Sequence, residues 1–324
     1  MRFLTEDDSI RDMVSHPAFA GIGACLVPRP ADAASDLPLA LAGRLMPWHG
    51  QVRPQAVVAA LNRLIRERAG GRTIFCRFYE SGPAREATGL FFFRGRPGAP
   101  FALICPGGGF AYVGSLHEGF PVACEIADAG FNAFVLHYRT GSGRTACIDL
   151  AHALVWILKH ARDLGVDPGG YSLWGGSAGA RMAAAVGSYG PAPFGAGPAP
   201  RPAAVIMGYT GHTDWQPGDP PTYAVVSRDD PIADWRVMRE RLSAMSRAGI
   251  RTRFRLLEHA GHGFGTGEGS EAEGWMQEAV AFWQEQLDLE AGERALRRAG
   301  SRAGSMAGSR TEKMAGGAAA PQGR

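Results

Sequence analysis

Residues 171–179 read YSLWGGSAG, and this stretch decides the fold that we expect for the whole chain. An apolar run leads into a serine between two glycines, Gly175-x-Ser177-x-Gly179, and a run of small residues follows it. A strand, a tight turn at a serine and a helix, in this order, make a nucleophile elbow, which exposes the serine hydroxyl above a sheet. Glycines on either side of that serine let the strand and the helix approach each other closely.

The serine pattern is weak on its own. In a chain of 324 residues with 45 Gly, G-x-S-x-G is expected by chance about 0.3 times. A glycine-rich turn with an incidental serine is therefore the alternative interpretation, and the surrounding sequence has to decide between the two.

Composition excludes several classes of protein. A hydrophobic content of 45% is ordinary for a globular protein, and no apolar run reaches the ~18 residues of a membrane-spanning helix. The N-terminal stretch MRFLTEDDSIRD lacks the apolar segment of a signal peptide. The cysteines are odd in number and irregularly spaced, which predicts reduced thiols in a cytoplasmic protein, with neither a disulfide framework nor a metal site.

The net charge of +3 is concentrated at the C-terminus. Residues 291–324 hold seven basic and two acidic residues, which leaves the preceding residues with a net charge of −2. We therefore expect no nucleic-acid partner for the folded part. The Arg-, Ala-, Gly- and Ser-rich composition of residues 291–324 predicts a disordered tail, and an interaction arm for nucleic acid or anionic membrane is the alternative.

Hydrophobic periodicity predicts strands that alternate with helices after an irregular, Pro- and Ala-rich extension at residues 1–50. Strands are expected at residues 73–79, 88–94, 101–105, 131–137, 171–176, 203–209, 222–227 and 252–258. Helices are expected at residues 54–70, 117–129, 146–164, 178–185, 234–248 and 271–288. The spacing Ser115-x-x-Glu118 predicts a capping box at the start of the second helix.

The connections between these elements predict how the strands pair. A turn region joins the first two strands, which favours an antiparallel pair. Helices separate the later strands, which implies parallel pairing and helices on both faces of one sheet. The sequence therefore predicts one α/β domain at residues 51–290, with an eight-stranded, mostly parallel sheet.

Candidate catalytic groups follow four of the predicted strands, at residues 107–110, at Ser177, at residues 229–230 and at residues 259–264. The active crevice of an open α/β sheet lies at the carboxyl ends of its strands. A serine hydroxyl needs a neutral imidazole to accept its proton and a carboxylate to orient that imidazole. The chain order serine, acid, histidine predicts such a triad.

Two positions in this triad have alternatives. His262 is favoured over His259 because it lies between glycines in a loop that can reach back to the serine. Asp230 is favoured as the acid. Side chains of adjacent residues point in different directions, so only one of Asp229 and Asp230 can orient the histidine, and Asp214 is the fallback.

The glycine run after the third predicted strand exposes backbone N–H groups. The amides of Gly108, Gly109 and Ala178 are candidate donors for an oxyanion, and a tight strand-to-helix turn is the alternative interpretation. The nearby aromatic residues Phe110 and Tyr112 either line an acyl pocket or pack in the core.

Three segments carry a resemblance to a known family: CPGGGFAYVGSLHEGFPVA, YSLWGGSAGARMAAA and GHGFGTGEGSEAEGWMQEAVAFW, which begin at residues 105, 171 and 261. They resemble α/β-hydrolase-fold esterases and lipases, in particular the acetyl-xylan-esterase-like branch of the carbohydrate esterases, over about residues 43–287. The resemblance implies the α/β-hydrolase fold and no metal or organic cofactor. It also implies roles for Ser177 (nucleophile), Asp230 (acid), His262 (base), and Gly108, Gly109 and Ala178 (oxyanion hole).

Two positions depart from the family pattern. Pro106 stands where the glycine run of lipases and esterases usually begins with His, so the hydrogen bonding that supports the loop must differ. Residues 228–231, RDDP, stand where many relatives have a glycine-containing turn, which bears on the assignment of Asp230.

The spacing of the candidate residues bears on the substrate. Ser177 and Asp230 are 53 positions apart, and two predicted strands occupy that interval, so no large cap is inserted there. An open site favours short acyl esters over long lipids, and acetyl esters of small sugars are one candidate. We expect a small-molecule ester as the partner, neither nucleic acid nor membrane, and leave the oligomeric state open. Amidases, formamidases and peptidases use the same triad, and a non-catalytic binding protein is a less favoured alternative.

Overall fold

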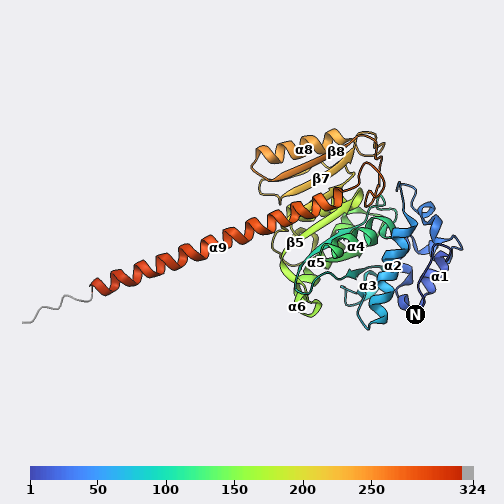
Figure 1. Ribbon diagram of the computed structural model, residues 1–324, viewed down its shortest axis with the longest axis horizontal. Coiled ribbons are helices and arrows are strands. Elements are labelled where there is room, and N and C mark those ends of the chain that lie inside the picture. Colours follow the sequence, from blue (N-terminus) through green and yellow to red (C-terminus); the bar gives the residue numbers. More distant parts are fainter. Residues whose placement is uncertain (316–324) are drawn as a thin grey trace, which may run out of the picture. The chain divides into compact units, whose positions relative to one another are not determined.

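The structure is a computed structural model that describes residues 1–315, with side chains described for residues 1–297. Its main feature is an eight-stranded sheet with helices packed on it (Figure 1). The strand order is β1-β2-β4-β3-β5-β6-β7-β8. Strands β3 to β8 pair in parallel, and β2 runs antiparallel to β1 and β4, which confirms the predicted fold class. The strands are β1 (Phe75–Cys76), β2 (Gly89–Phe93), β3 (Pro100–Cys105), β4 (Asn132–His137), β5 (Asp167–Gly176), β6 (Ala204–Gly208), β7 (Thr222–Ser227) and β8 (Thr252–Leu257).

Helices precede and separate these strands. The α-helices are α1 (Ile10–Ser15), α2 (Pro54–Ala69), α3 (Gly82–Ala87), α4 (Phe120–Asp128), α5 (Gly143–Lys159), α6 (Ala161–Leu164), α7 (Ala178–Tyr189), α8 (Trp235–Arg247) and α9 (Trp275–Ala315). Short 3₁₀ helices are η1 (Pro17–Phe19), η2 (Gly23–Cys25), η3 (Pro30–Ala34), η4 (Leu39–Leu45) and η6 (Ala192–Phe194), and η5 (Ser115–Gly119) is one turn of π-helix. The chain divides into two units, Met1–Trp283 and Gln284–Arg324.

Helices cover both faces of the sheet because its central strands are apolar on both sides. Every residue of β2, β4, β6 and β7 is buried. In β3, the alternate residues Phe101, Leu103 and Cys105 join the core cluster that includes α5, α7 and α8. On the opposite face, the ring of Phe120 in α4 packs against Phe91 of β2. This burial on both faces is typical of parallel sheets with helical crossovers.

Two glycines let α7 lie directly against the sheet. A Cβ atom at Gly179 would overlap the carbonyl oxygen of Cys105 at the end of β3, and one at Gly175 would overlap the backbone of Gly179. The glycines of the G-x-S-x-G pattern therefore serve the close approach that the sequence predicts for them, and this approach fixes the turn at Ser177.

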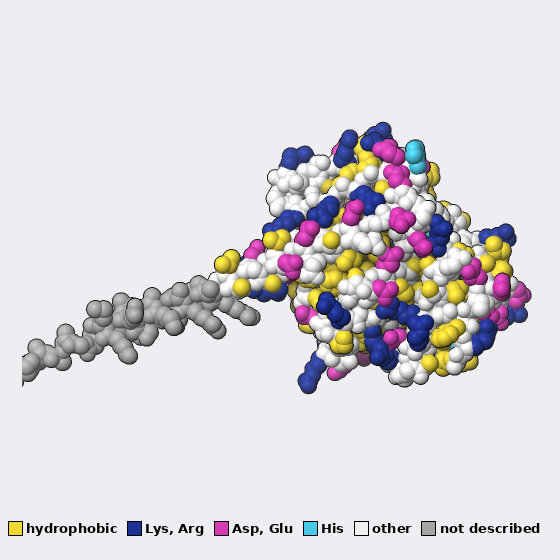
Figure 2. Space-filling view, in the orientation of Figure 1, with side chains coloured by type: hydrophobic (Ala, Val, Ile, Leu, Met, Phe, Trp, Pro, Cys, Tyr) yellow, Lys and Arg dark blue, Asp and Glu magenta, His cyan; other side chains and the backbone are white. Residues whose placement is uncertain are grey.

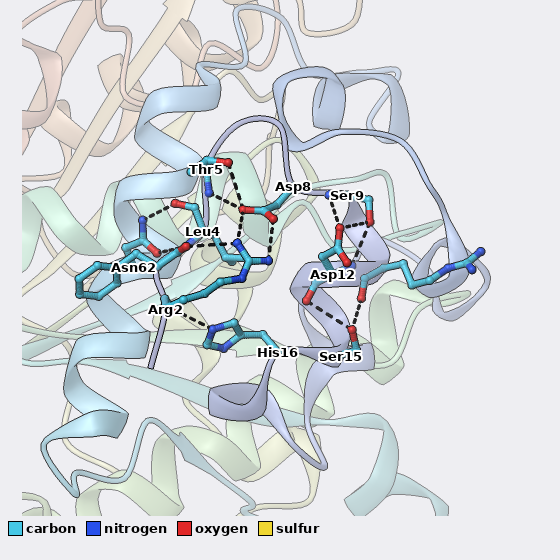
Figure 3. Close-up of polar contacts among 11 residues, drawn as sticks. Arg2, Leu4, Thr5, Asp8, Ser9, Asp12, Ser15, His16 and Asn62 are labelled. Atoms are coloured by element: carbon cyan, nitrogen blue, oxygen red, sulfur yellow. Dashed lines mark hydrogen bonds and ion pairs between the residues drawn. The ribbon is translucent and has the colours of Figure 1, made fainter.

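The N-terminal segment, residues 1–50, is made of short helices and turns that pack on the domain. Its backbone is tied to α2 by Asn62, whose side chain accepts from Leu4 N at 2.8 Å and donates to Leu4 O at 2.9 Å (Figure 3). Ser9 and Asp12 form a capping box at the start of α1. The segment that the sequence describes as irregular is thus held in place by specific hydrogen bonds.

Two predicted features differ in the structure. Ser115 makes no capping hydrogen bond, and Glu118 is buried rather than placed at a helix surface. Helix α9 continues to Ala315, where the composition predicts a disordered tail from residue 291. Ion pairs one helical turn apart, Glu290–Arg294 and Glu293–Arg297, support this extension. Residues 316–324 of the predicted tail lie outside the described residues.

Basic and acidic side chains are interspersed on the face of the molecule that Figure 2 shows. A nucleic-acid-binding surface is marked by a basic stripe, and the described part of this face has none. Among residues 1–315, no helix combines the length and the apolar character needed to cross a membrane.

Candidate active site

Ser177 occupies a strained turn between β5 and α7. Its backbone has φ 51° and ψ −118°, a combination that L-residues rarely adopt, and its N–H donates to Gly208 O on β6 at 2.9 Å. Such strain persists only where the surrounding structure imposes it, and it is common at functional sites. The turn at Ser177 therefore has the geometry of a nucleophile elbow.

A chain of hydrogen bonds links this serine to a histidine and an aspartate. His262 Nε2 lies 2.9 Å from Ser177 Oγ, and His262 Nδ1 lies 2.8 Å from Asp230 Oδ2. The side chain of Asp230 is fully buried and that of His262 is 6% exposed. Because a carboxylate can only accept, Nδ1 carries the proton and Nε2 is left to accept from the serine hydroxyl.

The carboxylate of Asp230 is fixed by its own turn. Its Oδ1 accepts from the amides of Ile232 and Ala233 at 2.8 and 2.9 Å, so that Oδ2 faces His262. The structure thus brings together Ser177, Asp230 and His262, the three residues that the sequence favours.

The alternative triad residues lie elsewhere. Asp229 accepts from Ser227 Oγ and from the amide of Gly261, and Asp214 accepts from the hydroxyl of Tyr189 at the end of α7. The side chain of His259 is 85% exposed and lies 3.8 Å from Asp229. None of the three contacts the serine.

The glycine loop after β3 turns sharply beside Ser177. Gly108, Gly109 and Phe110 all have positive φ angles, of 126°, 60° and 61°. Within the described residues, the amides of Gly108, Gly109 and Ala178 have no hydrogen-bond partner. These amides are therefore free to donate to a ligand, as an oxyanion hole requires.

A cavity of about 200 Å³ opens at the serine. Of the predicted pocket residues, Phe110 lines this cavity, whereas Tyr112 is fully buried beside it and its hydroxyl contacts Trp48 N and His49 Nδ1. Of the predicted oxyanion residues, Gly109 and Ala178 also line it, and Gly108 does not. The lining residues are Gly109, Phe110, Ser177, Ala178, Arg181, Tyr209, Thr210, Gly211, Ile232, Ala233 and His262.

Several charged or polar groups at the site escape prediction from sequence. Arg181 and Tyr209 line the cavity, and nothing in their local sequence marks them. Glu118 and His49 form a buried pair beneath the glycine loop. Glu118 is a charged residue inside the apolar stretch SLHEGFPVA, and that contrast is a usable signal.

Burial and charge shift two pKa values beneath the loop. Burial favours the neutral form of Glu118, but the neighbouring His49 and His117 and the amide of Gly107 outweigh it and lower the pKa of Glu118 to about 2. Burial, together with the neighbouring His49, lowers the pKa of His117 to about 4. Glu118 is thus an anion, and His117, which bonds to Gly263 O at 2.8 Å, is neutral at pH 7.

The described residues contain no group of three or more His, Cys, Asp or Glu side chains that could hold a metal ion. Four cysteines are buried and the fifth, Cys124, is partly buried; all are free thiols.

Comparisons with known proteins place the fold. No family model matches the sequence. Among curated proteins, esterase LipQ and the probable carboxylic ester hydrolase LipM of Mycobacterium tuberculosis are 28% identical over 89 residues and 29% identical over 87 residues. Each match covers 26% of this chain and about a fifth of the relative, 21% and 20% respectively.

Solved structures align over more of the chain. MGS-M1, an α/β hydrolase enzyme from a deep-sea metagenome library, superposes with a TM-score of 0.56 at 20% identity, over 66% of this chain and 97% of that one. The acetyl ester-xyloside bifunctional hydrolase of Caldicellulosiruptor lactoaceticus superposes with a TM-score of 0.56 at 18% identity, over 65% of this chain and 95% of that one. The carboxylesterase Cest-2923 of Lactobacillus plantarum superposes with a TM-score of 0.53 at 22% identity, over 61% of this chain and 92% of that one. At these low sequence identities the structural similarity shows a shared fold and nothing further. The chain has the α/β-hydrolase fold.

Proposed function

We propose that the protein is a serine carboxylesterase that cleaves short-acyl esters, with acetyl esters of small sugars as one candidate class. The observation that carries this proposal is the chain of hydrogen bonds from Ser177 through His262 to Asp230, built on a strained serine turn. The likeness to short segments of two esterases, and to the fold of a carboxylesterase and an acetyl ester hydrolase, supports it.

The proposed reaction is a two-step acyl transfer. Ser177 Oγ attacks the ester carbonyl carbon while His262 Nε2 accepts its proton, and the amides of Gly108, Gly109 and Ala178 donate to the oxyanion. His262 then protonates the leaving alcohol, which leaves the acyl group on Ser177. Water attacks this acyl-enzyme with His262 as the base and releases the acid.

The size of the cavity supports a short acyl group. At about 200 Å³ it is smaller than the roughly 300–1,000 Å³ pockets that hold drug-sized ligands. Residues 209–221 join β6 to β7 without a helix, so no cap domain is inserted over this part of the site. We further propose a small-molecule ester as the partner, a cytoplasmic location and no requirement for a cofactor.

A p-nitrophenyl ester series tests this proposal. Wild type is expected to cleave C2 to C4 esters faster than C8 to C12 esters, and Ser177→Ala should lose activity by a factor of about 10⁴–10⁶. Turnover of p-nitroanilides or formamides but not esters would favour an amidase or formamidase with the same triad. A wild type that turns over neither and does not react with a fluorophosphonate would contradict the proposal.

A further inference from the structure

A buried carboxylate lies directly beneath the glycine loop. The side chain of Glu118 is 2% exposed, and its Oε2 accepts from the amide of Gly107. A Cβ atom built at Gly107 would lie 2.6 Å from Glu118 Oε2, and one built at Gly176 would lie 2.7 Å from the same oxygen, so this carboxylate lies against both the loop and the residue before Ser177. Burial of an unpaired charge costs free energy, so the group that pairs with this carboxylate matters for its stability beneath the loop.

The partner is His49, which comes from the N-terminal segment. His49 Nε2 lies 2.8 Å from Glu118 Oε1, and the His49 side chain is 1% exposed. Within the described residues neither atom has a hydrogen-bond partner, so this close contact is the interaction that offsets the burial of the two atoms. His49 Nδ1 contacts the hydroxyl of Tyr112 at 2.8 Å, which fixes the orientation of the imidazole ring.

The neighbours of His49 contact both sides of the proposed catalytic centre. A Cβ atom at Gly109 would lie 2.6 Å from the ring of Trp48, so Trp48 limits the movement of the glycine loop. On the other side, Gly50 N donates to His262 O at 3.2 Å. Residues 48–50 thus connect the loop that carries the amide donors to the loop that carries the histidine.

This connection is held by the rest of the N-terminal segment. The segment is anchored to α2 through Leu4 and Asn62 (Figure 3), and its 3₁₀ helix η4 packs against the same helix. The packing of the N-terminal segment on α2 therefore places His49 beside Glu118.

We propose that Glu118 and His49 are positioning residues, which hold the Gly107–Gly109 loop so that its amides point at the substrate carbonyl oxygen. The inference rests on the proposed function. Glu118 fixes the loop through the amide of Gly107, and His49 pairs with the other carboxylate oxygen and so holds the carboxylate in place beneath the loop. The N-terminal segment thus completes the catalytic centre.

Two single variants and their combination test the proposal. Glu118→Gln removes the charge and is expected to lower kcat about 10- to 100-fold, less than the 10²–10³-fold loss of a direct oxyanion donor, with KM changed less than twofold. His49→Gln leaves the buried carboxylate without its partner beneath the loop and should lower kcat further. The double variant should recover part of the His49→Gln loss, because the unpaired charge is gone.

Binding of a trifluoromethyl ketone separates positioning from general destabilisation. The serine hydroxyl oxygen adds to the ketone carbon, its proton passes to His262, and the adduct carries an oxyanion. Its affinity should fall in Glu118→Gln by the same factor as kcat/KM. The matched control is Asp219→Asn, which disturbs an equally buried pair with Arg241 and Ser188 and should lower stability but leave kcat per titrated site unchanged.

The possible outcomes distinguish this inference from the proposed function. If wild type cleaves esters and Glu118→Gln keeps kcat and inhibitor affinity within twofold, the positioning role is overturned and the esterase proposal stands. If wild type neither turns over esters nor reacts with a fluorophosphonate, the proposed function itself fails. Should Glu118→Gln not fold, His49→Gln, which keeps the bond to Gly107, decides by the same two measurements.

Discussion

At the scale of single residues, the direction of the side chain decides which of two adjacent aspartates bonds to His262. Asp230 is oriented toward His262 by two backbone amides of its own turn, whereas Asp229 accepts from Ser227 and Gly261. The two side chains share their charge and their place in the sequence, so they form a matched pair for experiment.

Asp230→Asn is expected to lower kcat by about 10⁴, because an amide at this position favours the wrong imidazole tautomer. Asp229→Asn should change kcat less than about threefold, since this residue touches neither His262 nor the cavity. Steady-state hydrolysis of p-nitrophenyl acetate by both variants measures the difference. Equal losses would show that the acid has been assigned to the wrong residue.

Arg181 is the residue expected to affect substrate choice. Its side chain lines the cavity, and the described lining contains no Asp or Glu side chain that could pair with it there. Arg181→Gln should raise KM about 3- to 10-fold for monoethyl succinate, whose carboxylate can pair with an arginine. Ethyl butyrate, which has no carboxylate, is the control substrate. An equal change for both esters would exclude an electrostatic role.

At the scale of elements, the packing of α7 against β3 and β5 determines where Ser177 points. Gly179→Ala should destabilise the fold by more than about 3 kcal/mol, because its Cβ would overlap the carbonyl of Cys105. Gly197→Ala is the control, since its Cβ would meet nothing closer than 3.7 Å. Urea unfolding followed by circular dichroism compares the two. Similar stabilities would show that α7 can move away from the sheet without loss.

Much of this element-scale structure could be predicted from sequence. The number of strands and their mostly parallel pairing follow from the alternation of apolar segments with helical ones, and the triad candidates follow from their position after strand ends. The contact between His49 and Glu118 could not be predicted, because it joins residues far apart through a segment that lacks periodicity. The spacing at Ser115 predicts a capping box, but the carboxylate of Glu118 bonds to Gly107 instead.

At the scale of the whole molecule, buried histidines make stability depend on pH. Burial lowers the pKa of His117, His137 and His212 to about 4, below the ordinary value of about 6.5. The folded state then binds fewer protons than the unfolded state, so stability present above pH 6.5 is lost as pH falls toward 4. Glu125, whose pKa burial raises to about 7, acts in the opposite direction over the same range.

Three histidines have a lowered pKa and one glutamate has a raised pKa, so the histidines dominate. The urea concentration at the midpoint of unfolding is therefore expected to decrease as the pH is lowered from 7 to 4.5. The fully buried His117 and His137 should each contribute on the order of 2–3 kcal/mol to this loss. His137→Gln should make the dependence on pH shallower, because it removes one of the groups whose pKa burial lowers. A midpoint that rises toward acid pH would contradict this account.

Deletion of residues 291–324 tests the C-terminal unit separately. Residues 291–297 are exposed, and we expect the truncated protein to keep kcat within twofold and Tm within a degree or two. A larger loss of activity, or a change in location within the cell, would indicate that this segment is an interaction arm.

The most direct test of the central claim is mass spectrometry of the protein after reaction with a fluorophosphonate. The account predicts one adduct per chain, located on Ser177 by peptide mapping, and no adduct on Ser177→Ala or on wild type denatured before the reagent is added. An adduct on a different residue, or none on a wild type that still hydrolyses esters, would show that Ser177 is not the nucleophile.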